Sequence, residues 1–420
     1  MGVMRRLARQ RGDDELRVAL VGAGFVGRNL TYQINFTPGM RTALILNRTA
    51  ANAVEAYRRA GFAVADVVVS DDPAVLSAAI QAGQPAVTSS IDAMCAIDDI
   101  EIVMEASGSA EYGAAVTRTA LEAGLDVVTM NAEADATVGY LLKTVAEKNG
   151  VVYTLADGDQ PGVLARLVEF VESSGFEVVT AINCKGFMDV HATPDSIKEW
   201  SVRQGTSLPM TTSFTDGTKM NIEQANVANA FNLLPEKRGM HGIKSTLATA
   251  TEDTMATLTG HGSVDYTLGG DFAGGVYVIG HLLDIERVKP AMRFLKMGEG
   301  PYYTFYRPYH LVHIEAPVSI AEVYLDREPT IVPAGPFVTD VVAIAKKNLA
   351  PGDMLDGIGG WTTYGEIDKV DNARDFLVVG LTEHARIVKP VRMDEPIPLD
   401  AVELNDEIPI VKDRYEQDAL

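Results

Sequence analysis

The sequence predicts an α/β protein with three parts: an N-terminal Rossmann domain built on a doubly wound parallel sheet, an α+β domain, and a small β-rich module. Three observations support this prediction. The apolar run from Arg17 to Val21 ends in a glycine motif that opens a helix. Strand-like and helix-like segments then alternate as far as Leu155. In the last part of the chain, short strands are separated by Pro and Gly turns. The expected domains are residues 1–156, 157–335 and 336–420.

The first strand ends in Gly22-x-Gly24-x-x-Gly27, and the following residues continue as a helix. Gly22 allows a tight turn, Gly24 lets a pyrophosphate approach the backbone, and Gly27 lets the helix pack closely on the strand. The phosphates then lie at the helix N-terminus. This context distinguishes the motif from a chance spacing among 37 glycines. The candidate cofactor-binding residues are Gly22, Ala23, Gly24, Phe25, Val26 and Gly27.

The second strand, Thr42 to Leu46, leads into Asn47-Arg48-Thr49. An NAD site usually has a carboxylate at this strand end for the ribose 2′-hydroxyl, whereas an Arg with small polar neighbours suits a 2′-phosphate. Asn47, Arg48 and Thr49 therefore favour NADP(H) over NAD(H). The alternative is that Arg48 is a solvated residue at a helix start.

Further strands and helices complete the predicted Rossmann domain. The expected helices are 50–60, 73–82, 92–96, 110–123 and 137–148, and the expected strands are 63–69, 86–88, 100–106, 126–130 and 151–155. Strand 100–106 ends in a small-residue turn, which makes Ala106, Ser107 and Gly108 candidate cofactor contacts, with a plain βα turn as the alternative. Asn131 follows the next strand and is a further cofactor candidate.

The strand 151–155 opens into Asp157-Gly158-Asp159, whose two carboxylates on a glycine turn are candidate ligands for a divalent cation such as Mg²⁺. Oxygen ligands suit a hard divalent cation. Asp and Gly also make ordinary turns, so both interpretations stay open.

A second group of ionisable residues follows the expected strand 177–183. Lys185, Asp189 and His191 lie within seven positions of one another. We expect Lys185 to bind a substrate phosphate or carboxylate, and Asp189 or His191 to transfer a proton. The alternative is a loop that carries surface charges.

The rest of the second domain is expected to be mainly antiparallel. Helices are expected at 194–204 and 223–232, a hairpin at 210–222 with its turn at Asp216-Gly217, and strands at 264–268 and 276–280. His241, in Gly239-Met240-His241-Gly242, is a candidate substrate ligand. Arg307 and His310 are two more, because they lie among five aromatic residues that can exclude water around an anion. Most of these aromatics are expected in the core.

Composition limits the function classes. The formal net charge of −21 argues against binding to nucleic acid or to an anionic membrane surface. Cys95 and Cys184 are the only cysteines, which argues against a disulfide framework or a cysteine-rich zinc site, and Cys184 is expected to be a buried small residue. We expect a cytoplasmic protein, without a secretory signal or a membrane span, whose partner is a small-molecule substrate. The acidic segment 406–420 is expected to be a surface tail.

Several motifs resemble the NADP-dependent oxidoreductases related to homoserine dehydrogenase. They are V-G-A-G-F-V-G at 21–27, E-A-S-G at 105–108, M-N-A-E-A-D at 130–135, A-T-P-D at 192–195, G-M-H-G at 239–242 and G-P-Y-Y-T-F-Y-R-P-Y-H-L at 300–311. Within that group the chain is most similar to the second, non-homologous type of 1-deoxy-D-xylulose 5-phosphate reductoisomerase, an enzyme of isoprenoid biosynthesis. The segment A-K-K-N-L-A-P-G-D at 345–353 resembles a SAF domain. The resemblance implies a homodimer.

Two departures limit what the resemblance implies. Homoserine dehydrogenases usually have an Asn-Lys pair where this chain has Asn131-Ala132, which makes homoserine an improbable substrate. The reductoisomerase group has a different stretch before A-T-P-D, where this chain reads 183–191. The resulting hypothesis is an NADP(H)-dependent oxidoreductase for a small, polar, phosphorylated carbonyl or hydroxyl compound. In the reductoisomerase scheme that the resemblance implies, Mg²⁺ or Mn²⁺ near Glu133 and Asp159 polarises the oxygens of the substrate. The alternatives are a simple dehydrogenase of another sugar or hydroxy acid, and a non-catalytic NADPH-binding sensor.

Overall fold

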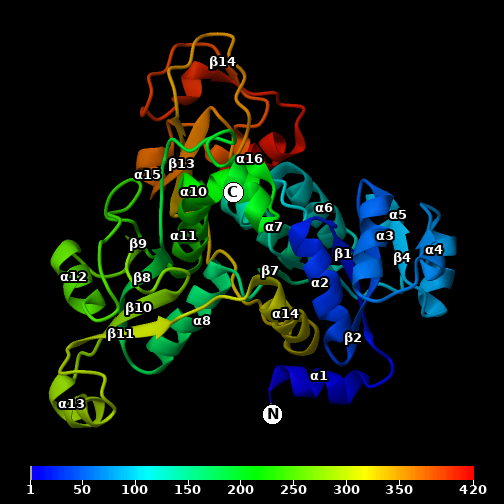
Figure 1. Ribbon diagram of the computed structural model, residues 1–420, viewed down its shortest axis with the longest axis horizontal. Coiled ribbons are helices and arrows are strands. Elements are labelled where there is room, and N and C mark those ends of the chain that lie inside the picture. Colours follow the sequence, from blue (N-terminus) through cyan, green and yellow to red (C-terminus); the bar gives the residue numbers. More distant parts are fainter. Residues whose placement is uncertain (1) are drawn as a thin grey trace. The chain divides into compact units, whose positions relative to one another are not determined.

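The computed structural model describes residues 2–420, which form two compact units (Figure 1). Unit 1 contains residues 1–159, 311–332 and 412–420, and unit 2 contains residues 160–310 and 333–411. The chain therefore leaves unit 1 after the expected Rossmann domain and returns to it twice.

Unit 1 is built on a seven-stranded parallel sheet with the strand order β3-β4-β2-β1-β5-β6-β7. Its strands are β1 (Leu16–Val21), β2 (Met40–Leu46), β3 (Val68–Val69), β4 (Ala86–Thr88), β5 (Ile102–Glu105), β6 (Asp126–Thr129) and β7 (Tyr153–Leu155). The central strand β1 has β2 on one side and β5 on the other, so the strand order reverses beside it. In such sheets ligands bind at the carboxyl edge near this reversal. The predicted fold class is confirmed.

Helices cover the sheet of unit 1. They are α1 (Val3–Arg11), α2 (Phe25–Phe36), α3 (Ala50–Arg59), α4 (Pro73–Gln81), α5 (Ile91–Cys95), α6 (Ala110–Glu122), α7 (Ala132–Asn149) and α14 (Val312–Asp326). The core combines strand residues with Leu7 of α1 and with Ile320 of α14, a helix that lies beyond the expected limit of the Rossmann domain at residue 156. The predicted strand 63–69 is mostly wrong, because a 3₁₀ turn occupies Val64–Asp66 and only β3 pairs with the sheet.

The C-terminal segment is a helix and not the expected surface tail. Helix α16 (Pro409–Asp418) buries Asp413, Arg414 and Gln417. Its Asp413 accepts a hydrogen bond from Arg118 of α6 at 2.5 Å. The prediction failed because acidic composition alone does not show that a few polar residues have buried partners.

The side chain of Gln417 forms hydrogen bonds with backbone groups on both sides of a break in helix α7. The backbone of Val138 leaves the helical region, with φ −139° and ψ 17°. The Leu141 amide donates to Gln417 Oε1 at 3.0 Å, and Gln417 Nε2 donates to the Thr137 carbonyl at 3.2 Å. In a regular helix these two backbone groups would bond to each other. The side-chain amide of α16 therefore takes the place of one missing helix bond.

Unit 2 contains a four-stranded mixed sheet with the order β11-β10-β8-β9. Its strands are β8 (Glu177–Lys185), β9 (Ser263–Leu268), β10 (Val276–His281) and β11 (Tyr302–Arg307). Strands β8 and β9 are parallel, while β10 is antiparallel to both β8 and β11. The carboxyl ends of β8, β9 and β11 consequently lie at the same end of the sheet. The accompanying helices are α8 (Gln160–Ser173), α9 (Lys198–Gln204), α10 (Leu208–Thr215), α11 (Thr218–Phe231), α12 (Ala250–Thr257) and α13 (Ile285–Phe294).

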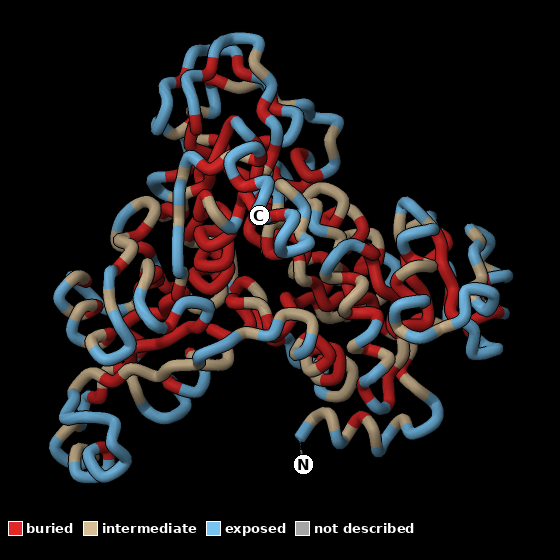
Figure 2. The backbone as a smooth tube through the Cα atoms, in the orientation of Figure 1, coloured by how far each residue is buried: buried red, intermediate tan, exposed pale blue. Residues whose placement is uncertain are grey.

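The expected hairpin at 210–222 is wrong, because α10 and α11 occupy these residues. Gly217, with φ 83°, turns the chain between two helices instead of two strands. Helix α11 is buried from Thr218 to Asn229, as Figure 2 shows. Its burial all round hides the amphipathic period by which a helix is usually recognised. With four helices from 198 to 257, the expected excess of strands in this region is also wrong.

The last part of unit 2 is β-rich, as predicted. Its elements are β12 (Thr339–Ala345), β13 (Thr363–Lys369), α15 (Val370–Ala373), β14 (Arg386–Ile387) and β15 (Val402–Glu403). Helix α11 is bonded to this part, because Thr218 Oγ1 accepts from the Gly365 amide and Asn221 Oδ1 from the Ile367 amide, each at 2.9 Å. The SAF assignment stays a prediction.

Across residues 2–420, no helix combines the length and the apolar character needed to cross a membrane.

Candidate functional site

The glycine turn of unit 1 has the geometry that the motif requires. Gly22 has φ +94°, and a Cβ on it would lie 2.8 Å from the Ala106 carbonyl oxygen. A Cβ on Gly27 would lie 2.0 Å from the Gly22 carbonyl oxygen, so helix α2 packs against the turn only without a side chain there. Gly24 instead faces open space, with no atom within 4 Å of its Cβ position. The backbone at the start of α2 is thus accessible to a pyrophosphate.

Two residues after β2 have different surroundings: Asn47 is hydrogen-bonded to the glycine turn, and Arg48 is exposed. Asn47 Oδ1 accepts from the Ala23 amide at 3.0 Å, and its Nδ2 donates to the Thr49 carbonyl at 2.8 Å. Asn47 therefore ties the glycine turn to the start of α3. Arg48 is exposed, and its guanidinium lies 5.7 Å from the centre of the Tyr112 ring. The strand end carries no carboxylate, because Asn47-Arg48-Thr49 follow β2 directly.

The β5–α6 turn is held by a buried carboxyl group. Glu105 accepts from the Ser107 amide at 2.7 Å and from Thr129 Oγ1 at 2.9 Å, and burial raises the pKa of this carboxyl. Asn131 caps α7 by accepting from the Ala134 amide at 3.0 Å, and its Nδ2 donates to the Ser109 carbonyl at 2.8 Å. The close approach of Gly22 to Ala106 shows that the two predicted turns lie together. The side chain of Asn131 positions this turn; a cofactor contact by Ala106, Ser107, Gly108 or Asn131 stays a prediction.

The predicted metal ligands Glu133 and Asp159 lie in unit 1, at the start of α7 and just before α8. In residues 2–420, the one group of three His, Cys, Asp or Glu side chains with metal-binding spacing does not include either residue. A cation at Glu133 and Asp159 therefore stays a prediction.

In unit 2, Lys185 ends β8 and its Nζ lies 3.2 Å from Glu223 Oε2 of α11. Asn183, two residues earlier on the same strand, donates to the same oxygen at 2.8 Å. Glu223 is buried, while 18% of the Lys185 side chain remains accessible. The Asn183 Oδ1 atom is buried without a hydrogen-bond partner. This end of β8 therefore holds an oriented ammonium group that solvent or a ligand can reach.

Arg307 and His310 lie at the same end of the sheet. Arg307 pairs with Val276, which also pairs with Asn183, so Arg307 lies two strand spacings from β8, about 10 Å. His310 Nδ1 lies 2.9 Å from the Gly274 carbonyl oxygen, just before β10. The Arg307 guanidinium lies 5.0 Å from the centre of the Tyr309 ring. Of the five aromatics here, Tyr303 is buried in a core cluster, and Tyr302, Phe305 and Tyr306 are partly buried and pack against core clusters, as expected. Tyr309 is exposed. β11 lies at the edge of its sheet, which leaves its rings half exposed.

His241 is oriented by a buried carboxylate. Asp265 of β9 is 1% exposed, and its Oδ2 lies 2.7 Å from His241 Nδ1. The same carboxylate accepts from the backbone amides of His241 and Gly242 at 3.0 and 3.1 Å. When the imidazole is neutral and donates from Nδ1 to Asp265, its Nε2 is a proton acceptor, and this atom lies 3.8 Å from Glu236 Oε2. This pair has the composition of a general acid–base group.

Asp189 and His191 make other contacts. The Asp189 amide donates to the Thr215 carbonyl at 2.8 Å, and its Oδ1 accepts from the His191 amide at 3.1 Å. His191 Nε2 lies 2.7 Å from Asp394 Oδ1 in the β-rich part of unit 2. Both residues are exposed. Their contacts are those of a turn and a surface pair, and their role in proton transfer stays a prediction.

Sequence reasoning missed Glu223 and Asp265, the carboxylates that orient Lys185 and His241. Glu223 follows the buried Lys219 by four residues, a polar stripe on a helix. Because a hairpin was expected at 210–222, Lys219 and Glu223 were assigned to different elements and this helical spacing was overlooked. Asp265 is a lone carboxylate inside a strand pattern, which was the available signal for it. Cys184 is buried as expected, and burial raises the pKa of its thiol to about 12.

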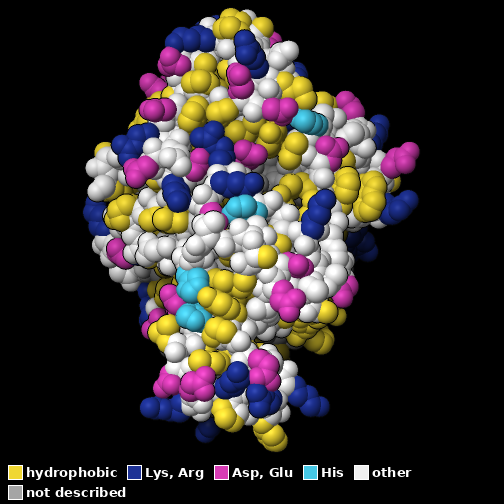
Figure 3. Space-filling view, turned by 90° about the vertical axis from the view of Figure 1, so that its left-hand side faces the viewer, with side chains coloured by type: hydrophobic (Ala, Val, Ile, Leu, Met, Phe, Trp, Pro, Cys, Tyr) yellow, Lys and Arg dark blue, Asp and Glu magenta, His cyan; other side chains and the backbone are white. Residues whose placement is uncertain are grey.

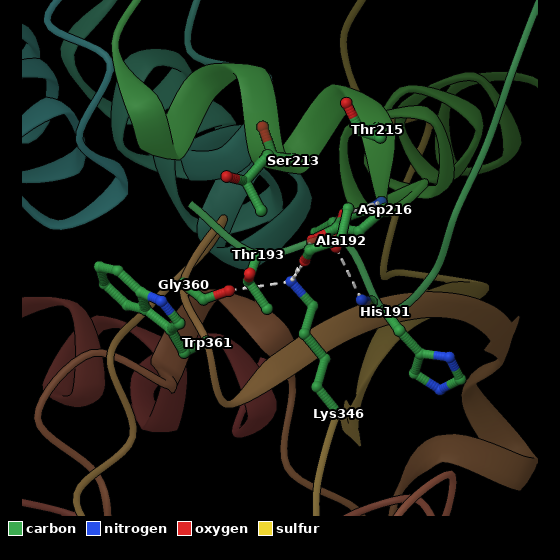
Figure 4. A network of polar contacts seen from close by, with 12 residues as sticks. His191, Ala192, Thr193, Ser213, Thr215, Asp216, Lys346, Gly360 and Trp361 are labelled. Atoms are coloured by element: carbon green, nitrogen blue, oxygen red, sulfur yellow. Dashed lines mark hydrogen bonds and ion pairs between the residues drawn. The ribbon is translucent and has the colours of Figure 1, made fainter. Parts of the chain in front are cut away.

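A second lysine of unit 2 is fully enclosed (Figure 4). Lys346, just after β12, donates to Asp216 Oδ2 at 2.7 Å, to the Ala192 carbonyl at 2.7 Å and to the Gly360 carbonyl at 2.9 Å. Its side chain is 2% exposed. All three ammonium protons have acceptors, so this group holds A-T-P-D at 192–195 to β12.

Two protein families match consecutive parts of the chain. Residues 22–155 match the homoserine dehydrogenase NAD-binding domain, and residues 158–316 match the family described as oxidoreductase DRL, catalytic domain. A comparison with curated protein sequences gives no match.

Solved structures give distant matches. A probable dehydrogenase from Thermotoga maritima is 11% identical, with 76% of this chain and 91% of that chain covered and a TM-score of 0.43. A putative NADPH-dependent oxidoreductase from Desulfitobacterium hafniense is 10% identical, with 75% and 89% covered and a TM-score of 0.41. The 3-ketoreductase KijD10 from Actinomadura kijaniata, in complex with NADP, is 14% identical, with 75% and 91% covered and a TM-score of 0.38.

Proposed function

Since the chain is an NAD(P)-dependent oxidoreductase, with an NAD-binding domain followed by an oxidoreductase catalytic domain, we propose that it uses NADP(H) on a small phosphorylated carbonyl or hydroxyl compound. The observation that carries the substrate class is the gathering of Lys185, Arg307 and His310 at one end of the sheet of unit 2. In a chain of net charge −21, such a local group of cationic and hydrogen-bonding side chains suits an anionic substrate.

The cofactor would be held by the glycine turn and by the residues after β2 and β5. The open backbone at Gly24 fits a pyrophosphate, and the exposed Arg48 fits a 2′-phosphate. The nicotinamide, when bound, supplies or accepts the hydride. The preference for NADP(H) rests on Arg48 and on the absence of a carboxylate in Asn47-Arg48-Thr49.

The substrate would be oriented by the side chains of unit 2. Lys185, which the buried Glu223 holds in place, and Arg307 would bind the phosphate or carboxylate of the substrate. The Nε2 atom of His241, which lies 3.8 Å from Glu236 Oε2, would exchange a proton with the reacting oxygen, because Asp265 fixes the imidazole through Nδ1. We assign the proton to His241 instead of Asp189 or His191, because the side chains of those two residues are engaged with a turn and with Asp394.

The specific reaction that we propose is that of the 1-deoxy-D-xylulose 5-phosphate reductoisomerase group. The test follows nicotinamide absorbance when protein and NADPH meet that sugar phosphate with Mg²⁺ or Mn²⁺. NADH and homoserine serve as controls. Oxidation of NADPH that depends on the sugar phosphate supports the reaction. Bound NADPH without turnover removes this substrate and keeps the cofactor assignment.

A simple dehydrogenase of another sugar phosphate or hydroxy acid is the second candidate. It is favoured by residues 183–191, which differ from the reductoisomerase pattern. A panel of phosphorylated sugars and branched hydroxy acids distinguishes the candidates, because hydride transfer without rearrangement leaves the carbon skeleton of the product unchanged.

A further inference from the structure

The far end of the sheet of unit 2 carries a second cluster of polar side chains. Glu177 begins β8, His281 ends β10 and pairs with Glu177, and His261 precedes β9. Lys185 lies eight residues along β8 from Glu177, which is about 26 Å in an extended strand. This cluster is therefore separate from the proposed substrate site.

The three side chains converge on one point. Glu177 Oε2 lies 3.1 Å from His261 Nδ1 and 3.0 Å from His281 Nδ1. One ligand atom from each residue lies within 4.8 Å of the others. Ligands of a tetrahedral zinc ion with bonds near 2.1 Å are about 3.4 Å apart, so small side-chain shifts would complete a site.

Aromatic packing holds both imidazoles in this orientation. His281 stacks on Tyr302, with ring centres 4.8 Å apart and an interplanar angle of 26°. The ring of His261 meets the rings of His281 and Tyr302 edge-on, at 5.1 and 5.7 Å. His261 Nε2 lies 3.4 Å from the Tyr302 hydroxyl. A histidine that binds a metal through one nitrogen commonly donates its other N–H to such an oxygen.

The cluster lies at the protein surface, with 20–44% of each side chain exposed. Figure 3 shows two His side chains next to each other on the face that it presents. A metal ion can therefore reach the cluster from solvent. Its exposure also leaves room for a water molecule as fourth ligand.

We propose that Glu177, His261 and His281 bind a divalent transition-metal ion, with Zn²⁺ as the preferred occupant. Two imidazoles and one carboxylate are a ligand set that zinc accepts, with a water in the fourth position. Each imidazole would bind the ion through Nδ1 as the neutral tautomer that carries its proton on Nε2. It links the first residue of β8, the last residue of β10 and the loop before β9, and so fastens this end of the sheet.

The test uses full-length protein without a histidine tag. Equilibrium dialysis with Zn²⁺ should give one ion per chain, and Zn²⁺ should raise the Tm. His281→Gln and His261→Gln should each weaken binding at least tenfold and abolish the Tm shift. His384→Asn is the matched control, because His384 is an exposed histidine of the same unit beside Glu383, 3.6 Å away, with φ 67°, which Asn tolerates.

Co²⁺ provides a spectroscopic check. A four-coordinate site gives intense visible absorption that Zn²⁺ displaces, and Glu177→Gln should abolish it even where a histidine variant folds poorly. Failure of the wild-type protein to bind Zn²⁺, or equal binding by the His281→Gln and His384→Asn variants, overturns the proposal. None of these measurements depends on the identity of the substrate.

Discussion

Two lysines of unit 2 pair with buried carboxylates at strand ends, yet their surroundings differ: Lys185 is the last residue of β8, and Lys346 directly follows β12. Lys346 directs its three protons to Asp216 and two backbone carbonyls and is 2% exposed. Lys185 lies beside Glu223 and is 18% exposed. This difference shows that a lysine paired with a buried carboxylate is not, for that reason alone, part of a functional site. The accessible ammonium is the one that can bind a substrate.

Loss of the Lys346 ammonium should have the largest effect. Lys346→Met leaves Asp216 buried without its cation, and burial already raises the pKa of this carboxyl. We expect a loss of about 3–5 kcal/mol in the free energy of unfolding, measured by urea denaturation. In the Lys346→Met/Asp216→Leu double variant, much of this loss should be recovered. A single variant as stable as the wild type would contradict an enclosed structural pair.

Asp135 is a buried carboxyl group that is hydrogen-bonded to the Tyr153 hydroxyl, whereas the buried Asp216 is paired with the Lys346 ammonium. Burial raises the pKa of Asp135 to about 7, while the hydroxyl of Tyr153, 2.9 Å away, lowers it. The usual value is 3.8, so this stabilising contribution is complete below about pH 4 and is lost as the pH rises through about 7. Each pKa unit corresponds to about 1.4 kcal/mol, which gives a contribution of at most about 4 kcal/mol. Asp135→Asn should flatten the pH dependence of urea unfolding between pH 4.5 and 8; an unchanged slope would exclude this group as its source.

Lys185→Ala should lower kcat/KM about 100-fold, because the variant removes a substrate-binding charge from an accessible position. It should lower the Tm less than Lys346→Met does, because Asn183 still donates a hydrogen bond to the buried Glu223 carboxylate. Steady-state kinetics with a substrate identified by the assays proposed above, together with thermal unfolding, measure the two effects. Lys185→Arg should recover part of the activity. A large loss of Tm without a loss of kcat/KM would place Lys185 in the same class as Lys346.

Gln417 is an enclosed side chain of unit 1. Gln417→Ala leaves the Leu141 amide and the Thr137 carbonyl without this partner, so we expect a loss of about 1–2 kcal/mol in stability. Hydrogen exchange should accelerate at the Leu141 amide. Gln33→Ala, a change at a half-buried helical position in the same unit, is the control. Equal exchange in both variants would show that α16 does not support the break in α7.

Arg48 is the accessible counterpart in unit 1 and has the smallest expected effect. Arg48→Ala should weaken NADPH binding about tenfold, the loss of one charge-assisted contact, and change NADH binding little. Fluorescence titration with both nucleotides gives the two Kd values. An equal change for NADPH and NADH would remove the 2′-phosphate assignment.

The sequence predictions are accurate where an element depends on residues close in the sequence, and they fail where it depends on contacts between residues far apart in the sequence. The glycine turn was predictable because each glycine answers a local backbone requirement, such as φ +94° at Gly22. The helices that replace the expected hairpin at 210–222 were not predictable, because α11 owes its stability to partners on both the sheet of unit 2 and the β12–β13 pair. The burial of the C-terminal helix was not predictable, because the partners of Gln417, Leu141 and Thr137, lie 276 and 280 residues earlier in the chain.

The sequence by itself determined the parallel sheet of unit 1, the glycine turn, and Lys185, Arg307 and His310 as candidate ligands, since these depend on short-range pattern and residue chemistry. Only the tertiary structure decided which lysine is accessible, that Asp265 orients His241, and that Glu177, His261 and His281 meet. Strand register and burial bring together residues that are far apart in the chain, and a single sequence does not contain those distances.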